Sequence, residues 1–166
     1  DEATKAQAAQ NGDNNNQIAV ARILKVFTYQ VMTDTWGDIP YSSFGGSNAT
    51  FDAGKAEQRV IYAQYSKQEL IYADLLKELK EASDQLNTGS SAFASGDAIY
   101  KGNALKWKKF ANSLSLRIAN RVRSKLNEAD NRIKEILANP AQYPIFESND
   151  DNALLAFETN DRTQAT

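Results

Sequence analysis

The chain has 166 residues, of which 42% are hydrophobic and 24% are charged, and its net charge at pH 7 is -2. This composition is that of a folded protein with a core, and the near-neutral charge gives no reason to expect a nucleic-acid partner. The chain contains no cysteine and no histidine, which excludes zinc sites built on thiolate or imidazole, histidine acid–base chemistry, and Ser-His or Cys-His nucleophiles. We expect no metal, no cofactor and no enzymatic activity.

The first 16 residues are rich in Asn, Gln, Ala and Gly, and we expect them to form a flexible polar segment. They lack the basic and apolar regions of a signal peptide, and no apolar run approaches the roughly 18 residues of a membrane span. Because the chain also stops without a closing element, we expect one helical domain, residues 1–166, taken from a longer protein.

A first helix is predicted from Gln17 to about Thr33. Its apolar residues recur at helical spacing and define one face, namely Val20, Leu24, Phe27 and Val31. Further apolar residues widen this stripe until it nearly surrounds the helix, so we expect a central, buried element. A long loop follows, because Gly37 permits a positive φ and Pro40 cannot continue a helix.

Two longer helices and one short helix are predicted in the remainder. Ser66 and Glu69 form a capping-box pattern ahead of a helix to about Leu86, after a short helical turn at residues 57–64. Asn103 is a candidate N-cap for a helix that reaches about Asn127 and carries the clearest apolar stripe. Residues 130–131 can cap a short helix that ends before Pro140, and residues 153–157 could form an extended segment.

Long helices joined in antiparallel pairs predict an all-α fold, either a bundle or a helical-repeat array with long loops. No 34-residue self-similarity is strong enough to define tetratricopeptide repeats from the sequence. Trp107 and Phe110 begin the best apolar stripe and should lie in the core, and Asn112 should be hydrogen-bonded inside the array. Arg117 lies near the same stripe, where an ion pair or a contact with carbonyl groups is expected.

Three stretches, in this order, resemble the SusD/RagB family. Asp34-x-x-Gly37-Asp38-x-Pro40-Tyr41 matches its D-x-x-G-D-x-P-Y signature, and residues 65–76 are similar to its Y-D-x-Q-x-x-I-Y-x-x-L-L helix, with Ser66 in place of Asp. Residues 97–117 are similar to D-x-x-Y-x-G-D-x-x-K-W-x-K-F-A-N-S-L-x-L-R, with Asn103 in place of Asp. The joint match covers about residues 18–157.

The resemblance implies a tetratricopeptide-like helical array in a lipid-anchored protein on the outer face of the bacterial outer membrane. Such a protein would bind an oligosaccharide or another nutrient and cover a SusC-like TonB-dependent transporter. A family member is expected to be around three times this length, so its lipid anchor would lie outside this chain. The alternative is a helical-repeat protein-interaction module that does not bind sugar.

The aromatic residues of the first loop are the candidate glycan contacts, because aromatic faces stack on sugar rings. They are Trp36, Tyr41 and Phe44. The alternative is that these rings pack back onto the helices, since Gly37, Asp38 and Pro40 are typical of a fixed chain reversal. A glycosidase pair at Asp34 and Asp38 is a distant third possibility, because both positions favour capping and loop hydrogen bonds.

Two further groups of residues each allow a functional and a structural interpretation. A calcium site at Asp97, Asn103, Asp150 or Asp151 has suitable oxygen ligands, but the spacing is not that of an EF-hand loop. Residues 98–127 contain eight basic residues and no acidic ones, which would suit an acidic partner or nucleic acid. We favour internal neutralisation of these charges by the acidic helix at residues 69–84.

Overall fold

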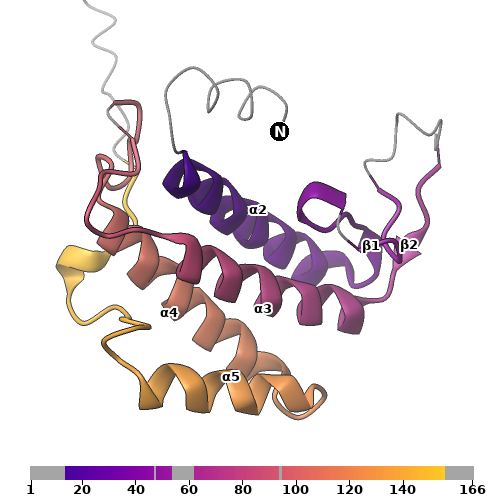
Figure 1. The fold of residues 1–166 in the computed structure, drawn as a ribbon. Helices are drawn as coiled ribbons and strands as arrows, with labels where there is room; N and C mark the ends of the chain where they lie inside the picture. Colours follow the sequence, from indigo (N-terminus) through magenta and orange to yellow (C-terminus); the bar gives the residue numbers. More distant parts are fainter. Residues whose placement is uncertain (1–13, 47, 54–61, 94, 156–166) are drawn as a thin grey trace, which may run out of the picture.

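The computed structural model describes residues 14–46, 48–53, 62–93 and 95–155 (Figure 1). Its helices are α2 (Asn15–Trp36), α3 (Gln68–Gln85), α4 (Ala104–Val122) and α5 (Asn127–Ala138), with the short 3-10 helices η1 (Phe44–Gly46) and η3 (Asn149–Asp151). Strands β1 (Ile39–Pro40) and β2 (Tyr65–Ser66) form a two-stranded antiparallel sheet in which Ile39 pairs with Ser66. The prediction of an all-α fold is confirmed.

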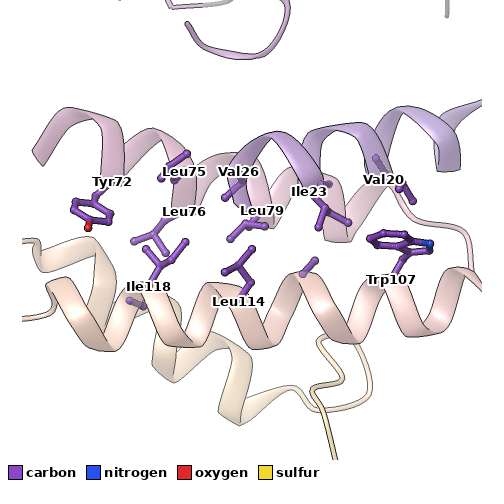
Figure 2. Packing of buried hydrophobic residues seen from close by; sticks show 14 of the residues in the cluster. Val20, Ile23, Val26, Tyr72, Leu75, Leu76, Leu79, Trp107, Leu114 and Ile118 are labelled. Carbon is purple, nitrogen blue, oxygen red and sulfur yellow. The ribbon is translucent and has the colours of Figure 1, made fainter. Parts of the chain in front are cut away.

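Successive helices run antiparallel, and α3 lies between α2 and α4 while α5 packs on α4 (Figure 1). The centre of the core is formed mainly by aliphatic side chains from the three longer helices, with Trp107 at one end and Tyr72 at the other (Figure 2). Ile23, Leu79 and Ile118 are at most 1% exposed and represent the three helices. Burial of such a side chain contributes about 1.5–3 kcal/mol, so this layer is the main source of stability.

The buried face of α2 differs from the predicted one. Val20, Ile23 and Val26 are buried, whereas Leu24, Phe27 and Val31 are 40%, 38% and 47% exposed. The expectation of a helix buried on nearly all sides is therefore wrong for the described residues. Apolar residues lie on two sides of α2, and within the described ranges only the side that faces α3 and α4 is covered.

Helix α2 begins earlier than predicted. Residues 1–13 of the expected flexible segment lie outside the described residues, but Asn15 already belongs to the helix. Asn16 is buried, its Nδ2 donates to the carbonyl oxygen of Asn87 at 2.9 Å, and its Oδ1 accepts from the Asn87 N–H at 2.7 Å. These bonds hold the start of α2 against the chain that leaves α3.

The break between the last two helices lies earlier than predicted. Helix α4 ends at Val122 and α5 begins at Asn127, so the predicted helix end near Asn127 and the predicted cap at residues 130–131 are both wrong. The Lys125 and Leu126 N–H groups bond to the Val122 carbonyl oxygen, which closes the turn between the helices.

The remaining boundary predictions have mixed outcomes. The Asn103 side chain accepts from the Lys106 N–H, as expected of an N-cap. Residues 62–64 are not helical, and residues 57–61 of the predicted turn lie outside the described range. Residues 153–155 have no regular structure, and Phe157 also lies outside the described range.

Candidate functional site

The first loop connects α2 to the start of α3 through Asp38. Gly37 has a φ of +76°, which turns the chain after α2. The Asp38 carboxylate accepts from the Gln68 N–H at 2.9 Å and from Lys67 Nζ at 2.9 Å. The hydrogen bond from the Gln68 N–H lowers the pKa of Asp38 below its usual range, and the hydrogen bond from Lys67 adds to this effect. Asp38 therefore caps α3 across 30 residues of sequence.

This finding corrects the predicted capping box. The N-cap position of α3 is Lys67, and no side chain of the N-cap residue bonds to the helix. Ser66 instead belongs to β2, where it pairs with Ile39. The short sheet brings Asp38 to the start of α3. The Gly-Asp-x-Pro-Tyr stretch therefore fastens the end of α2 to the start of α3.

Asp34 connects α2, α3 and α4. Its carboxylate accepts from the Gln30 side-chain amide and the Tyr72 hydroxyl, and it forms an ion pair with Arg121 at 3.2 Å. Burial raises the pKa of Tyr72, and the hydrogen bond to Asp34 adds to this effect, which brings the pKa to about 12. Asp34 and Asp38 are thus each held by donors from other elements, which is the arrangement of structural carboxylates.

Tyr41 is part of the core. Its side chain is 0% exposed, its hydroxyl donates to Asp74 Oδ2 at 2.7 Å, and its ring meets those of Tyr29 and Phe51 edge-on, with centroids 4.7 Å apart in both cases. The expectation that Tyr41 contacts a glycan does not hold in this arrangement, because no face of its ring reaches solvent. Tyr41 instead anchors the loop.

Phe44 and Trp36 differ from Tyr41. Phe44 is half-buried, and the Arg22 guanidinium lies 4.8 Å from the centre of its ring. Trp36 is 68% exposed at the end of α2. Tyr65 in β2 and Tyr62 before it are 71% and 87% exposed. Because β1 follows α2 by two residues and pairs with β2, these exposed aromatic residues belong to the same end of the molecule.

A buried ionic cluster lies beneath the loop. Arg22 Nε bonds to Glu78 Oε2 at 2.9 Å, and Lys25 Nζ lies 5.2 Å from the centre of the Tyr41 ring. Burial lowers the pKa of Lys25, although Glu78 and Asp74 oppose this effect. The sequence analysis missed this cluster. The sequence does contain a sign of this cluster, because Arg22 and Glu78 are charged residues at positions that belong to the apolar stripes of their helices.

The third family-like stretch folds around Asp97. Its carboxylate accepts from the backbone N–H groups of Ile99, Tyr100 and Gly102 and from Trp107 Nε1, the last at 2.7 Å. Trp107 is 2% exposed, as expected for a core residue. Among the described residues, no group of three or more acidic side chains is placed to hold a metal ion.

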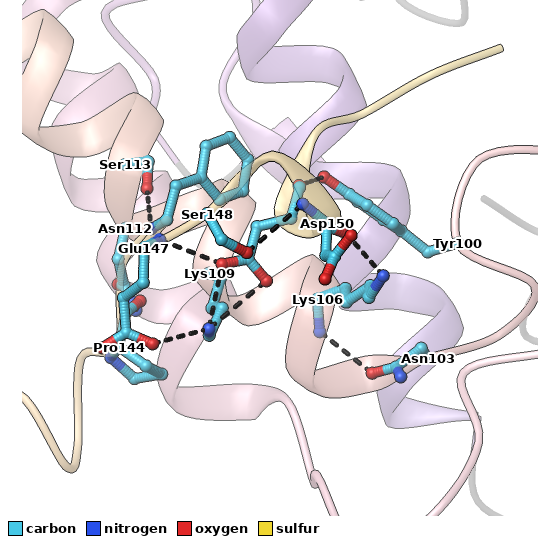
Figure 3. A network of polar contacts seen from close by, with 12 residues as sticks. Tyr100, Asn103, Lys106, Lys109, Asn112, Ser113, Pro144, Glu147, Ser148 and Asp150 are labelled. Carbon is cyan, nitrogen blue, oxygen red and sulfur yellow. Dashed lines mark hydrogen bonds and ion pairs between the residues drawn. The ribbon is translucent and has the colours of Figure 1, made fainter.

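The tail from residue 143 to residue 151 is fastened along α4 (Figure 3). Asp151 accepts from Lys109 Nζ at 3.0 Å and from the Glu147 N–H at 2.9 Å, while Lys106 donates to the Asp150 carbonyl oxygen. Asn103, Asp150 and Asp151, considered above for calcium, therefore cap a helix or tie down this tail. The sequence did not indicate that the tail packs here.

Asn112 and Arg117 lie on different sides of α4. Asn112 is 0% exposed, its Nδ2 donates to the Pro144 carbonyl oxygen at 3.0 Å, and its Oδ1 accepts from Arg132. The expected internal hydrogen bonds of Asn112 are thus present. Arg117 is exposed and donates to the side-chain carbonyl oxygen of Gln30 at 2.6 Å.

Three of the eight basic residues of 98–127 form ion pairs within the described ranges, and none of their partners lies on α3. Lys109 pairs with Glu147 and Asp151, Arg121 pairs with Asp34, and Arg123 pairs with Asp130. The acidic residues of α3 instead bond to α2, to the loop or to lysines of α3, as the Arg22–Glu81 and Lys77–Glu81 pairs show. Internal pairing is present, but α3 is not its source.

A hollow lies beside the contacts that Asp38 and Tyr72 make. It has a volume of about 560 Å³ and is bordered by the start of α3 and the end of α4, including Asp38, Lys67, Tyr72 and Arg121. Trp36 does not line it. The hollow and the exposed aromatic residues are therefore separate features of the molecule.

Comparisons with known proteins identify the family. A family model named SusD-like_2, described as "Starch-binding associating with outer membrane", matches residues 1–166. The chain belongs to the SusD-like family. The search of curated proteins found no match.

Solved structures of SusD-like proteins share this helical array. A chitin-binding protein is 38% identical with a TM-score of 0.66, and the match covers 86% of this chain and 28% of that one. A SusD homolog from Bacteroides uniformis is 31% identical with a TM-score of 0.67, covering 94% and 30%. A SusD homolog from Bacteroides thetaiotaomicron is 29% identical with a TM-score of 0.69, covering 92% and 29%. The chain thus spans less than a third of the length of these relatives.

The family associates with the outer membrane. Within the described ranges, no helix combines the length and the apolar character needed to cross a bilayer. The three family-like stretches now have structural explanations, since Asp34 and Asp38 fasten the ends of helices, Tyr72 contacts Asp34, and Asp97 organises the turn before α4.

Proposed function

We propose that this chain is the helical part of a glycan-binding surface lipoprotein in a SusC/SusD-type uptake system, and that it binds its ligand without covalent chemistry. Membership of a starch-binding, outer-membrane-associated family carries this proposal. The 38% identity to a chitin-binding protein makes chitooligosaccharides the first ligands to test. A SusC-like transporter as partner, a lipid anchor and an extracellular position belong to the same proposal.

Trp36 is the residue of this chain that best suits contact with a sugar. Most of its ring is open to solvent, and it is the last residue of helix α2. The buried Tyr41 and its bond to Asp74 hold the loop that follows. An exposed aromatic side chain on a fixed base offers an apolar face to a sugar ring at small entropic cost.

Titration calorimetry with chitooligosaccharides and starch oligosaccharides tests this proposal. If Trp36 stacks on the ligand, Trp36→Ala should weaken binding about tenfold or more, the equivalent of about 1.4 kcal/mol. Tyr65→Ala is a suitable control because Tyr65 is equally exposed at the same end. Equal affinities of the wild type and Trp36→Ala would exclude Trp36 as a contact.

Fluorescence provides a second measurement, because the chain has two tryptophans that differ in exposure. Trp36 is 68% exposed and Trp107 is 2% exposed, so Trp107→Phe leaves a single tryptophan at the proposed contact. Oligosaccharide should then change the emission of Trp36 and shield it from acrylamide. If no member of a broad glycan panel binds, the protein-interaction alternative becomes the better description, and the exposed apolar residues Leu24, Phe27 and Val31 of α2 are the observation that favours it.

A further inference from the structure

Two charged atoms of the buried ionic cluster lack a hydrogen-bond partner. Lys25 Nζ and Glu78 Oε1 are both shielded from solvent, and neither has a partner among the described residues. Glu78 is 1% exposed, and its other carboxylate oxygen accepts from Arg22 Nε at 2.9 Å. Such atoms are rare in folded proteins, because a buried charged group without its hydrogen bonds costs free energy. Each of the two atoms therefore needs a further partner.

The two atoms belong to facing turns of α2 and α3. Lys25 lies one turn after Arg22 on α2, and Arg22 forms an ion pair with Glu78. Burial lowers the pKa of Lys25, and the charge of Glu78 opposes this effect, so the two groups attract each other. Lys25 Nζ and Glu78 Oε1 are nevertheless further apart than a hydrogen bond, because otherwise each would be the partner of the other.

The aromatic rings around Lys25 do not satisfy its donors. The ammonium lies 5.2 Å from the centre of the Tyr41 ring and 5.8 Å from that of Tyr29. A ring attracts a cation, but it does not replace the oxygen acceptors that three N–H donors require. The Tyr41 hydroxyl bonds to Asp74 and not to Lys25. The partner of Lys25 Nζ therefore comes from outside the side chains of this cluster.

The charges of the two atoms decide which molecule can join them. A cation would be repelled by Lys25, and an anion would be repelled by Glu78. A neutral molecule must accept a hydrogen bond from Nζ and donate one to Oε1, and water does both in the smallest volume. We propose that one ordered water molecule is bound between Lys25 Nζ and Glu78 Oε1, where it accepts from the ammonium and donates to the carboxylate.

This water site lies beneath the base of the first loop. The Lys25 ammonium faces the ring of Tyr41, and Tyr41 anchors that loop through its bond to Asp74. The water completes a chain of contacts that runs from Glu78 on α3 through Lys25 on α2 to Tyr41 in the loop. The inference concerns the interior of the helical array and is independent of glycan binding.

Crystallography of this chain tests the site directly. A solvent peak should lie within about 3.2 Å of both Lys25 Nζ and Glu78 Oε1. Crystals of Lys25→Met should lack this peak, because the methionine side chain offers the water no donor. A direct ion pair between Lys25 and Glu78 in the wild type would overturn the proposal, and so would two separated atoms with no peak between them.

Thermal denaturation of Lys25→Met provides a second test, through the sign of its effect. Burial lowers the pKa of Lys25 more than Glu78 and Asp74 raise it, so an ammonium without hydrogen bonds is unfavourable here, and its removal would raise Tm. If water joins Lys25 to Glu78, the substitution instead takes the partner from a buried carboxylate, and Tm should fall by about 3 °C or more.

Lys134→Met is the matched control for the loss of a lysine charge. Lys134 is exposed on α5, and its substitution should leave Tm within about 2 °C of the wild type. A Tm of Lys25→Met equal to or above that of the wild type would overturn the proposal.

Discussion

Tyr41→Phe separates a packing role of the first loop from a binding role. The substitution keeps the buried ring and its edge-on contacts with Tyr29 and Phe51, but it removes the hydroxyl that donates to Asp74 at 2.7 Å. Asp74 is itself only 6% exposed, so its carboxylate loses a donor in a buried setting. A hydrogen bond to a charged group contributes about 1.5–3 kcal/mol, and we expect a loss of about 2 kcal/mol in the free energy of unfolding.

Urea denaturation followed by circular dichroism measures this loss. For a chain of this size, 2 kcal/mol corresponds to a fall of roughly 4–8 °C in Tm. Tyr65→Phe is the matched control and should change stability by less than about 0.5 kcal/mol, because Tyr65 is 71% exposed. Glycan affinity of the folded Tyr41→Phe protein should equal that of the wild type. An unchanged stability with reduced glycan affinity would refute the structural assignment of Tyr41.

Two further predictions concern the turn before α4. Burial alone would raise the pKa of Asp97, but donors from Tyr100, Trp107 and Gly102 hold it below the ordinary value of 3.8. Its stabilising effect is therefore full at neutral pH and is lost as the pH falls below about 4, so urea midpoints at pH 7 and pH 3 should differ less in Asp97→Asn than in the wild type. Gly102→Ala should lower the thermal midpoint, because Gly102 has a φ of +81° and a Cβ there would collide with the Phe93 carbonyl oxygen. An unchanged midpoint would contradict this reasoning.

Local patterns predicted those parts of the fold that depend on neighbours in sequence. The α4 stripe, its Asn103 cap and the core position of Trp107 follow from spacing and residue type alone. The capping box at Ser66 was wrong although its pattern is present. Asp38 reaches the start of α3 through the β1–β2 pairing. A four-residue pattern cannot contain information on a contact between residues 30 positions apart.

The aromatic residues of the first loop show a second limit of sequence reasoning. Trp36, the last residue of α2, and Tyr41 in the loop that follows are five positions apart, yet one is 68% exposed and the other fully buried. What separates them is a partner, because Asp74 on α3 offers an acceptor to the Tyr41 hydroxyl and fixes the ring inside. Composition could nominate both rings for sugar contact, but only the position of α3 decides between them.

The α2 helix extends the same argument to whole surfaces. Periodicity identified its apolar residues but could not tell which of them face a neighbouring helix, so Leu24 and Val31 were assigned to the core. Their exposure alongside α3-facing residues such as Ile23 means that α2 has two apolar sides, and that the described residues cover only one. A helix keeps uncharged residues on a second side when that side is also covered in the working protein. The error in the sequence prediction and the exposed apolar side of α2 are therefore the same observation.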